Sequence, residues 1–530
     1  MTFIANRRQF LKVGGVAVGT LAGTTGRFAT YAQGTPGAGG EQVLPDDPRF
    51  GDLAHGFNQR WVGTPAYVAL CSDAGQVAQA VQVAVDDGLR LTVRSGGHCY
   101  EDFASGNAGG VIVDLSGMAA VWRDAESGWY GVEPGARLLD VYTTLAQEHG
   151  VTIPGGSCHS VGAGGHVTGG GYGLLSRLHG LTVDYLQAVE LVHVTQDGRA
   201  EIVTVSRESA DPDEQDLLWG HQGGGGGNFG VVTKLFFGDL PPAPTTAYLY
   251  STSFDWSTLD QAGFRRLLQN YGNFMVENSG VDSPYNGVFP LLALLQKPAG
   301  HIGLTAQYVG DEPQRLEEFA RAVSAGLPTA RARVKPGLHH KLLRQSSEIQ
   351  SYDWLQLTEQ LSGSGPSRRG KYKSAYMIEP FPDEQIDVIY EHLVNPSNPN
   401  TSALLQVDGY GGQVNAIETG ATAIPQRSSV MKLQYQTYWT DAAEDEANLE
   451  WIRSFYTAMY GDEGPVPGQI MDGCYVNYPD ADLPNWAALY YKEGYPRLQR
   501  VKARWDPLNV FNHRQSIELA DATGSATPSA

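Results

Sequence analysis

The stretch Gly155-Gly-Ser-Cys-His-Ser-Val-Gly-Ala-Gly-Gly-His-Val-Thr-Gly-Gly-Gly-Tyr-Gly173 indicates the fold better than any other part of the chain, because nine of its nineteen residues are glycine. A backbone without Cβ atoms can adopt positive φ angles and lie directly against a ligand. Ordering so many glycines costs much conformational entropy, so something must hold the segment. Flexible linkers do not usually contain an embedded Cys, His and Val. The stretch therefore predicts a ligand-binding loop, in which the thiol of Cys158 could hold the ligand covalently.

The composition indicates a large folded protein with an acidic surface. The chain has 530 residues, more than one hydrophobic core usually supports, so two or three domains are expected. Hydrophobic residues make up 42% of the sequence, which is typical of a globular protein. A net charge of -20 repels phosphate groups, and this argues against nucleic acid as a partner.

The N-terminus has the features of an export signal. Arg7 and Arg8 precede a short apolar run at 13–22 and a polar segment rich in Gly and Thr. Twin arginines in this position are typical of twin-arginine signals. The apolar run is shorter than the roughly 20 residues that a helix needs to cross a bilayer, so a membrane anchor is not expected. We expect residues 1–32 to be a signal for the twin-arginine translocase, 33–44 to be a disordered lead-in, and the protein to be periplasmic or extracellular.

Helices and strands alternate in the first half of the chain. The apolar patterns predict helices at 72–88, 137–148 and 211–219, and strands at 89–93, 111–115, 129–132, 185–194 and 231–237. Ser72 is the expected N-cap of the first helix, and Gly150 lies just beyond the second. The alternation is compatible with an α+β or an α/β unit.

A second glycine run lies at 222–230. Gly225, Gly227 and Gly230 formally satisfy the G-x-G-x-x-G pattern of dinucleotide-binding sites. The predicted helix precedes this run and the predicted strand follows it, which is the reverse of the order in a Rossmann βαβ unit. A Rossmann-type NAD site is therefore not expected.

The prolines at 241–244 mark a boundary, and strands with amphipathic helices follow. We expect strands at 301–308 and 430–439, helices at 312–323 and 485–504, and frayed residues from 520 onwards. The strand at 430–439 alternates with a period of two and places four polar residues on one face, namely Lys432, Gln434, Gln436 and Tyr438. This face is either the wet side of an antiparallel sheet or the polar lining of a cavity above a cofactor, and the pattern leaves both open.

The cysteines and histidines do not form a metal-binding pattern. Cys71, Cys99, Cys158 and Cys474 could form disulfides in an exported protein, but their spacing requires none. No CxxC or HExxH motif is present, so no metal site is expected. His159 and His166 are the weakest metal candidates, because they lack partners at ligand spacing.

Six motifs occur in an order that resembles a known family. They are Arg94-Ser-Gly-Gly-His98, Val113-Asp-Leu-Ser116, the Cys158 loop, Gly227-Asn-Phe-Gly-Val-Val232, Tyr475-Val-Asn-Tyr478 and Phe511 with Gln515-Ser-Ile517. Together they resemble the berberine-bridge-enzyme-like oxidases of the vanillyl-alcohol-oxidase flavoprotein superfamily. The resemblance covers about residues 45–520.

The resemblance implies a two-domain α+β fold with a PCMH-type FAD-binding domain. This domain would comprise residues 45–243 and 455–518. A substrate-binding domain at 244–454, an antiparallel sheet covered by helices, would be inserted between the two parts. Residues 519–530 would be a disordered tail.

The resemblance also implies that FAD is bound twice covalently, through an 8α-histidyl bond to His98 and a 6-S-cysteinyl bond to Cys158. The backbone N–H groups of Ser95, Gly96 and Gly97 could hold the pyrophosphate. Val161 matches a position where many oxidases of the family have valine, which leaves room for O2. The further residues that we assign to the FAD site are Arg94, Ser116, Gly156, Gly162, Gly165, Gly170, Gly230, Val232, Tyr475 and Asn477.

The family's catalytic base matches Tyr478. A phenol with a pKa near 10 is a poor base at neutral pH, and lowering it by ~2–3 units requires roughly 3–4 kcal/mol. Lys432 is the expected source, and Tyr172 would stack on this cation. Gln434 would form a hydrogen bond with the substrate or the flavin edge. Relatives that close a carbon–carbon ring have a glutamate where Lys432 stands, so alcohol oxidation is preferred.

The expected reaction is the oxidation of a CH–OH group in a sugar, an oligosaccharide or a glycosylated natural product. Hydride would pass to FAD, and O2 would reoxidise it to give H2O2. Two alternatives stay open. One is a dehydrogenase that uses an acceptor other than O2, and the other is a non-catalytic protein that binds flavin or carbohydrate.

Overall fold

The computed structural model describes residues 40–328, 349–363, 365–397 and 399–520. The expected export signal, residues 33–39 of the lead-in and residues 521–530 of the tail lie outside the described residues. The expectation of a disordered lead-in is wrong for residues 41–43, which form strand β1 (Glu41–Val43) against β2 (Tyr67–Leu70). Among the described helices, none is both long and apolar enough to cross a membrane.

The first sheet has four strands in the order β1-β2-β4-β3. Strand β4 (Val111–Asp114) is parallel to both β2 and β3 (Leu91–Arg94), while β1 is antiparallel to β2. Helix α2 (Ala74–Asp86) connects β2 to β3 and buries four small apolar side chains. Its cap is Asp73, whose carboxylate accepts a hydrogen bond from the Gln76 N–H, so the expected cap at Ser72 is one residue too early.

The second sheet has five antiparallel strands in the order β5-β6-β9-β7-β8. Their bounds are β5 Val121–Arg123, β6 Tyr130–Val132, β7 Leu186–Val194, β8 Ala200–Ser206 and β9 Val231–Phe237. Helix α3 (Leu138–His149) ends at Gly150, which adopts the left-handed conformation with φ 68°. Helix α6 (Pro212–His221) precedes the second glycine run and β9 follows it, as the sequence pattern predicts.

The third sheet has seven antiparallel strands in the order β13-β10-β12-β11-β15-β16-β14. Their bounds are β10 Thr246–Asp255, β11 Val288–Leu295, β12 His301–Tyr308, β13 Gln350–Asp353, β14 Arg369–Met377, β15 Leu404–Gly409 and β16 Met431–Trp439. All of them lie within the expected insertion at 244–454, whose boundaries stay a prediction. The fold therefore combines helices with a mixed and two antiparallel sheets, and the expected α+β class is confirmed.

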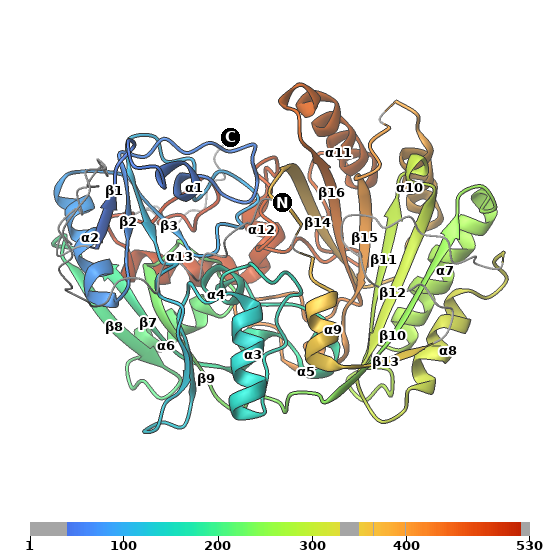
Figure 1. Ribbon diagram of the computed structural model, residues 1–530, viewed down its shortest axis with the longest axis horizontal. Coiled ribbons are helices and arrows are strands. Elements are labelled where there is room, and N and C mark those ends of the chain that lie inside the picture. Colours follow the sequence, from blue (N-terminus) through green and yellow to red (C-terminus); the bar gives the residue numbers. More distant parts are fainter. Residues whose placement is uncertain (1–39, 329–348, 364, 398, 521–530) are drawn as a thin grey trace, which may run out of the picture. The chain divides into compact units, whose positions relative to one another are not determined.

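Four helices lie along one face of the seven-stranded sheet (Figure 1). They are α7 (Gln261–Glu277), α8 (Gln314–Val323), α10 (Asp383–Val394) and α11 (Asp445–Tyr460). Tyr435 of β16 points to this face and packs its ring on Phe455 of α11. Lys432 and Gln434 point to the other face and are nevertheless buried. The polar face of β16 is therefore not a wet surface, and the cavity described below lies against it.

Six further α-helices complete the described part of the chain. They are α1 Phe50–Ala54, α4 Ala163–Thr168, α5 Ser176–His179, α9 Trp354–Gln360, α12 Trp486–Tyr491 and α13 Tyr495–Trp505. The predicted helix at 485–504 is divided at Lys492, which has a φ of 48°. The Lys492 ammonium binds Asp472 and the Pro425 carbonyl, and these contacts hold the chain in a conformation that a continuous helix does not allow.

Candidate active site

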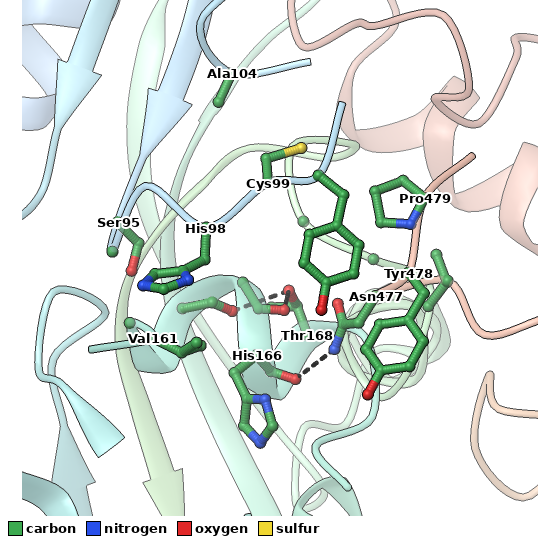
Figure 2. A pocket seen from close by; sticks show the side chains of 18 of the residues that line it. Ser95, His98, Cys99, Ala104, Val161, His166, Thr168, Asn477, Tyr478 and Pro479 are labelled. Atoms are coloured by element: carbon green, nitrogen blue, oxygen red, sulfur yellow. Dashed lines mark hydrogen bonds between the residues drawn. The ribbon is translucent and has the colours of Figure 1, made fainter. Parts of the chain in front are cut away.

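A cavity of about 380 Å³ collects most of the residues that the sequence motifs single out. Its wall includes the turn after β3, the Cys158 stretch, the second glycine run and the segment 475–479. Figure 2 shows His98 and Ser95 on one side of this pocket and Asn477 and Tyr478 on the other. Segments that are hundreds of residues apart in sequence thus meet at one site.

Two glycines allow the His98 turn and the Cys158 stretch to touch. A Cβ atom on Gly96 would lie 2.3 Å from the Gly162 nitrogen, and one on Gly162 would lie 2.5 Å from the Gly96 nitrogen. No residue with a side chain fits at either position without a shift of the backbone. A hydrogen bond of 2.9 Å between His98 Nε2 and Ser160 Oγ links the same two segments.

Other glycines leave open space for a ligand. A Cβ atom on Gly165 would have no atom within 4 Å, although Gly165 lines the cavity. A Cβ on Gly226 would meet only the Thr168 hydroxyl at 3.3 Å and the Gly165 Cα at 3.8 Å. Side chains at these two positions would project into the cavity and fill space that a flat ring system needs. The residues present therefore fit a flavin held against bare backbone.

Most of the predicted cofactor residues line this cavity. Those that do are Arg94, Ser95, Gly96, Gly97, His98, Gly156, Cys158, Val161, Gly162, Gly165, Gly230, Val232, Tyr475 and Asn477. Ser116 and Gly170 are not part of the wall. Ser116 binds Asp114, which also pairs with the Arg94 guanidinium, so Ser116 supports the wall from behind. A Cβ on Gly170 would lie 3.0 Å from Ile424, which is not part of the cavity wall either.

The imidazole of His98 is kept neutral. Burial lowers its pKa to about 4, and the positive charges of Arg137 and Arg94 act in the same direction. The ring stacks on Phe57 with centroids 4.5 Å apart. A neutral imidazole has an unshared electron pair on one nitrogen, which is the form that can make a covalent bond to carbon.

Cys158 is a free thiol, and so are the three other cysteines. Burial raises the pKa of Cys158 to about 11, although the nearby Lys432 partly opposes this. Gly363 covers the sulfur, because a Cβ on this residue would lie 2.8 Å from Cys158 Sγ. Cys99 also borders the cavity, and its sulfur points away from the ring of His98 (Figure 2).

Tyr478 and Asp408 line the cavity, and Lys432, which is not part of the wall, connects them from behind. Lys432 Nζ donates to the Tyr478 hydroxyl at 3.0 Å and lies 2.9 Å from Asp408 Oδ2. The side chains of Lys432 and Asp408 are 0% and 4% exposed. In Figure 2 the Tyr478 ring reaches inward from the segment that also carries Asn477.

The pKa of Tyr478 differs from the expectation. Burial raises it well above its ordinary value, and the negative charge of Asp408 raises it further. The expected net lowering of the Tyr478 pKa is therefore wrong for the protein alone, because burial, and after it the charge of Asp408, dominates. The hydrogen bond from Lys432 can still stabilise the phenolate at the moment when a proton arrives or leaves.

Aromatic rings surround the Lys432 ammonium. Its nitrogen lies 4.6 Å from the centroid of Tyr172 and 5.8 Å from that of Tyr475. The stacking of Tyr172 on this cation is the arrangement that the sequence motif predicts. Asn477 donates a hydrogen bond to the His166 carbonyl at 2.9 Å, which fixes the segment before Tyr478 against α4.

Gln434 has a different position from the one expected. Its side chain is not part of the cavity wall, and its amide donates to the Tyr100 hydroxyl at 3.0 Å. Tyr100 does line the cavity, and it stacks on Tyr372 with centroids 3.6 Å apart. Gln434 therefore lies behind the wall and orients one of its residues, and its contact with substrate or flavin stays a prediction.

Several wall residues were not predicted from the sequence. They are Tyr100, Tyr372, Gln406, Asp408 and the glycines 225–227. The alternation Leu404-Leu-Gln-Val-Asp-Gly409 places Gln406 and Asp408 on one face of β15, and this signal could have indicated them. The pairing of Asp408 with Lys432 depends on the register between β15 and β16, for which the sequence has no local signal.

The two histidines of the glycine stretch have structural partners. His159 Nε2 interacts with the Thr358 carbonyl at 2.9 Å, and His166 Nε2 accepts a hydrogen bond from the Gly156 N–H at 3.0 Å. Within the described part of the chain, no three His, Cys, Asp or Glu side chains gather as metal ligands would.

Two segments of the chain match known protein families. Residues 65–204 match the FAD binding domain family, and residues 474–518 match the family described as berberine and berberine like. The first segment contains His98 and Cys158, and the second contains Tyr478.

Known proteins are similar over nearly their whole length. The aclacinomycin-N/aclacinomycin-A oxidase of Streptomyces galilaeus is 38% identical over 550 positions, which cover 96% of this chain and 98% of that protein. The hexose oxidase of Chondrus crispus is 37% identical, and the alignment covers 89% of this chain and 93% of that protein. Among solved structures, a glycopeptide hexose oxidase in complex with teicoplanin is 38% identical, with a TM-score of 0.84 and 90% of this chain and 98% of that chain covered.

Proposed function

We propose that this chain, which belongs to the berberine-bridge-enzyme-like family of FAD-linked oxidases, oxidises a CH–OH group of a sugar or of a glycosylated natural product. The observation that carries the proposal is the Tyr478 hydroxyl, held 3.0 Å from Lys432 Nζ at the wall of the cavity. The substrate class is supported by the relatives, one a hexose oxidase and another a glycopeptide hexose oxidase.

The chemistry divides between the cofactor and the chain. FAD, when bound, accepts a hydride from the substrate carbon and passes the electrons to O2, which gives H2O2. The chain must remove the proton of the substrate hydroxyl, and Tyr478 Oη is the atom placed to take it. Lys432 Nζ donates a hydrogen bond to this oxygen and stabilises the negative charge that it needs as a base. Asp408 holds Lys432 from the other side and keeps the ammonium in position.

The wall next to this base is suited to a polyhydroxylated substrate. Gln406, Asp408 and Tyr438 line the cavity and offer donors and acceptors. The Gln406 amide nitrogen donates to Asp408 at 2.8 Å, and this hydrogen bond fixes the direction of the Gln406 side-chain oxygen. Amide and phenol groups at fixed positions are the features that orient a bound sugar among apolar neighbours.

The second part of the proposal is the double attachment of FAD. His98 would form an N–C bond to the 8α carbon, and Cys158 an S–C bond to C6. Both residues line one cavity, and the His98–Ser160 hydrogen bond holds their segments together. Each bond would replace one hydrogen of the flavin and one of the side chain, and the two electrons and two protons released per bond would pass to O2 to give H2O2.

Removal of both attachment residues should release the flavin. We expect wild-type protein, His98→Ala and Cys158→Ala to keep yellow flavin in the pellet after denaturation and acid precipitation, because one bond is enough. The double variant should leave all its FAD in the supernatant. The absorbance of pellet and supernatant, with the intact mass of each protein, measures this directly.

Cys99→Ala is the matched control, since Cys99 is a half-buried thiol next to His98 in the sequence, and the proposal assigns it no bond to FAD. It should retain the mass increment of the wild type. A colourless wild-type pellet with free FAD in the supernatant would contradict double attachment without contradicting the binding of FAD.

A further inference from the structure

A buried group of charged side chains lies behind one wall of the cavity. Lys371 Nζ lies 2.5 Å from Glu101 Oε1 and 2.6 Å from Asp480 Oδ1, and Lys373 Nζ lies 2.7 Å from Asp480 Oδ2. These four side chains are at most 4% exposed, and their formal charges cancel. We call them the charge cluster. Asp482, which is 26% exposed, contacts both lysines at its rim.

The charge cluster does not line the cavity, but each member lies beside a tyrosine that does. In sequence, Tyr100 precedes Glu101, Tyr372 stands between Lys371 and Lys373, and Tyr478 precedes Asp480 by two positions. On β14, alternation sends Tyr372 toward the cavity and both lysines to the opposite face. Every segment that carries one of these tyrosines is thus fixed by a buried charge next to it.

The three tyrosines also contact one another. Tyr100 stacks on Tyr372 at 3.6 Å between centroids, and its ring lies 5.4 Å from that of Tyr478. They come from the turn after His98, from β14 and from the segment after Tyr475. No local backbone connection sets their relative position, so contacts between the segments must do it.

The backbone around Asp480 is held by further bonds. The Asp480 N–H donates to the Tyr490 hydroxyl at 3.1 Å, and the Asp480 carbonyl accepts from Gln515 at 2.7 Å. The Ala481 N–H donates to Glu101 Oε1 at 3.3 Å. The cluster therefore restrains the main chain two residues beyond the base and not only a pair of side chains.

We propose that the charge cluster is a positioning device, which sets the Tyr478 base against the His98 turn and β14. The inference rests on the proposed role of Tyr478. Apolar residues of similar size could fill the same space with equal stability, because burying ions is costly. Charged residues also define how the three segments align, because each lysine is neutralised only when its carboxylate partners lie within contact distance. Loss of the cluster should therefore lower the rate of the chemical step more than substrate binding.

The test uses Lys371→Met and the double variant Lys371→Met/Glu101→Gln. The double variant removes one charge of each sign, so it leaves no unpaired charge and can fold where the single variant does not. Arg369→Gln is the matched control. Arg369 lies on the same strand and face, but its partner Asp445 belongs to α11 and is not beside a tyrosine of the cavity.

Two measurements on the full flavin-bearing protein decide the matter. Hydrogen–deuterium exchange, which needs no substrate, should become faster in both segments 98–104 and 476–483 of the double variant and stay unchanged in Arg369→Gln. With the hexose that bleaches the wild-type flavin fastest, the reduction rate at saturation should fall at least tenfold while flavin content and substrate Kd stay unchanged. Unchanged exchange in either segment, or an unchanged reduction rate, would overturn the proposal. If no sugar reduces the flavin of the wild-type protein, the proposed function is refuted instead. The hydrogen–deuterium exchange result would still show whether the charge cluster holds the two segments.

Discussion

Tyr478→Phe is expected to slow the reduction of the flavin by substrate about 10²- to 10⁴-fold, which is the usual contribution of a general base. Only the hydroxyl is lost, because the phenylalanine ring can keep the edge contact with Tyr475 at 5.0 Å. The variant then lacks the oxygen atom to which we assign the uptake of the substrate proton. Anaerobic stopped-flow measurement of flavin bleaching gives the rate at saturation and the substrate Kd separately.

Tyr435→Phe provides the control for this substitution. Tyr435 lies on the opposite face of β16, and its buried hydroxyl forms a hydrogen bond with Tyr460 at 2.9 Å. Its loss should lower stability and leave the reduction rate unchanged. A Tyr478→Phe rate within about threefold of the wild type would show that another group takes the proton.

Lys432→Met should lower the reduction rate at neutral pH roughly 10- to 100-fold, which corresponds to the loss of a charge-assisted hydrogen bond worth ~1.5–3 kcal/mol. In the proposed mechanism Tyr478 acts in its deprotonated form, so the rate should rise with pH as the phenol titrates. Burial and Asp408 already hold the pKa of Tyr478 above its ordinary value. Removing the cation raises it further, and the rising limb of the pH–rate profile should move to higher pH.

Asp408→Asn should shift the pKa of Tyr478 in the direction opposite to Lys432→Met. An asparagine oxygen can still accept a hydrogen bond from Lys432, which lies 2.9 Å from the carboxylate. The substitution removes the negative charge that raises the pKa of Tyr478. The rising limb of the pH–rate profile should move to lower pH by about one unit, which corresponds to a change of ~1.4 kcal/mol in the free energy of deprotonation. Movement of both variants in one direction would exclude the proposed balance between Lys432 and Asp408.

The sequence predicted those parts of the site that consist of local motifs. The Arg94–His98 turn, the Cys158 stretch and the Tyr475–Tyr478 segment each have a distinct composition, and all border the cavity. The alternation in β16 also predicted the polar face that carries Lys432, but it left open whether this face is wet, and only the structure shows that it is buried. In these cases the function of a residue depends on its immediate neighbours in the chain.

The parts that were missed depend on pairing between distant segments. Asp408 acts on Tyr478 only because the register of β15 and β16 sets it opposite Lys432. The direction of the pKa shift of Tyr478 follows from that pairing and from burial, which a pattern of residues does not reveal. The charge cluster likewise combines Glu101, Lys371 and Asp480 from three segments, each of which is unremarkable by itself.

If this chain takes hydride from a sugar CH–OH group and passes the electrons to O2, its flavin must lose colour with sugar and regain it with oxygen. The purified flavin-bearing protein is mixed without oxygen with a panel of hexoses, disaccharides and glycosylated aromatic compounds, and the flavin absorbance is followed before and after O2 is added. We expect bleaching by at least one sugar, return of the colour with O2, and one H2O2 per sugar oxidised. Absorbance that stays constant across the whole panel, or reduced flavin that persists in the presence of O2, would refute the proposed oxidase activity.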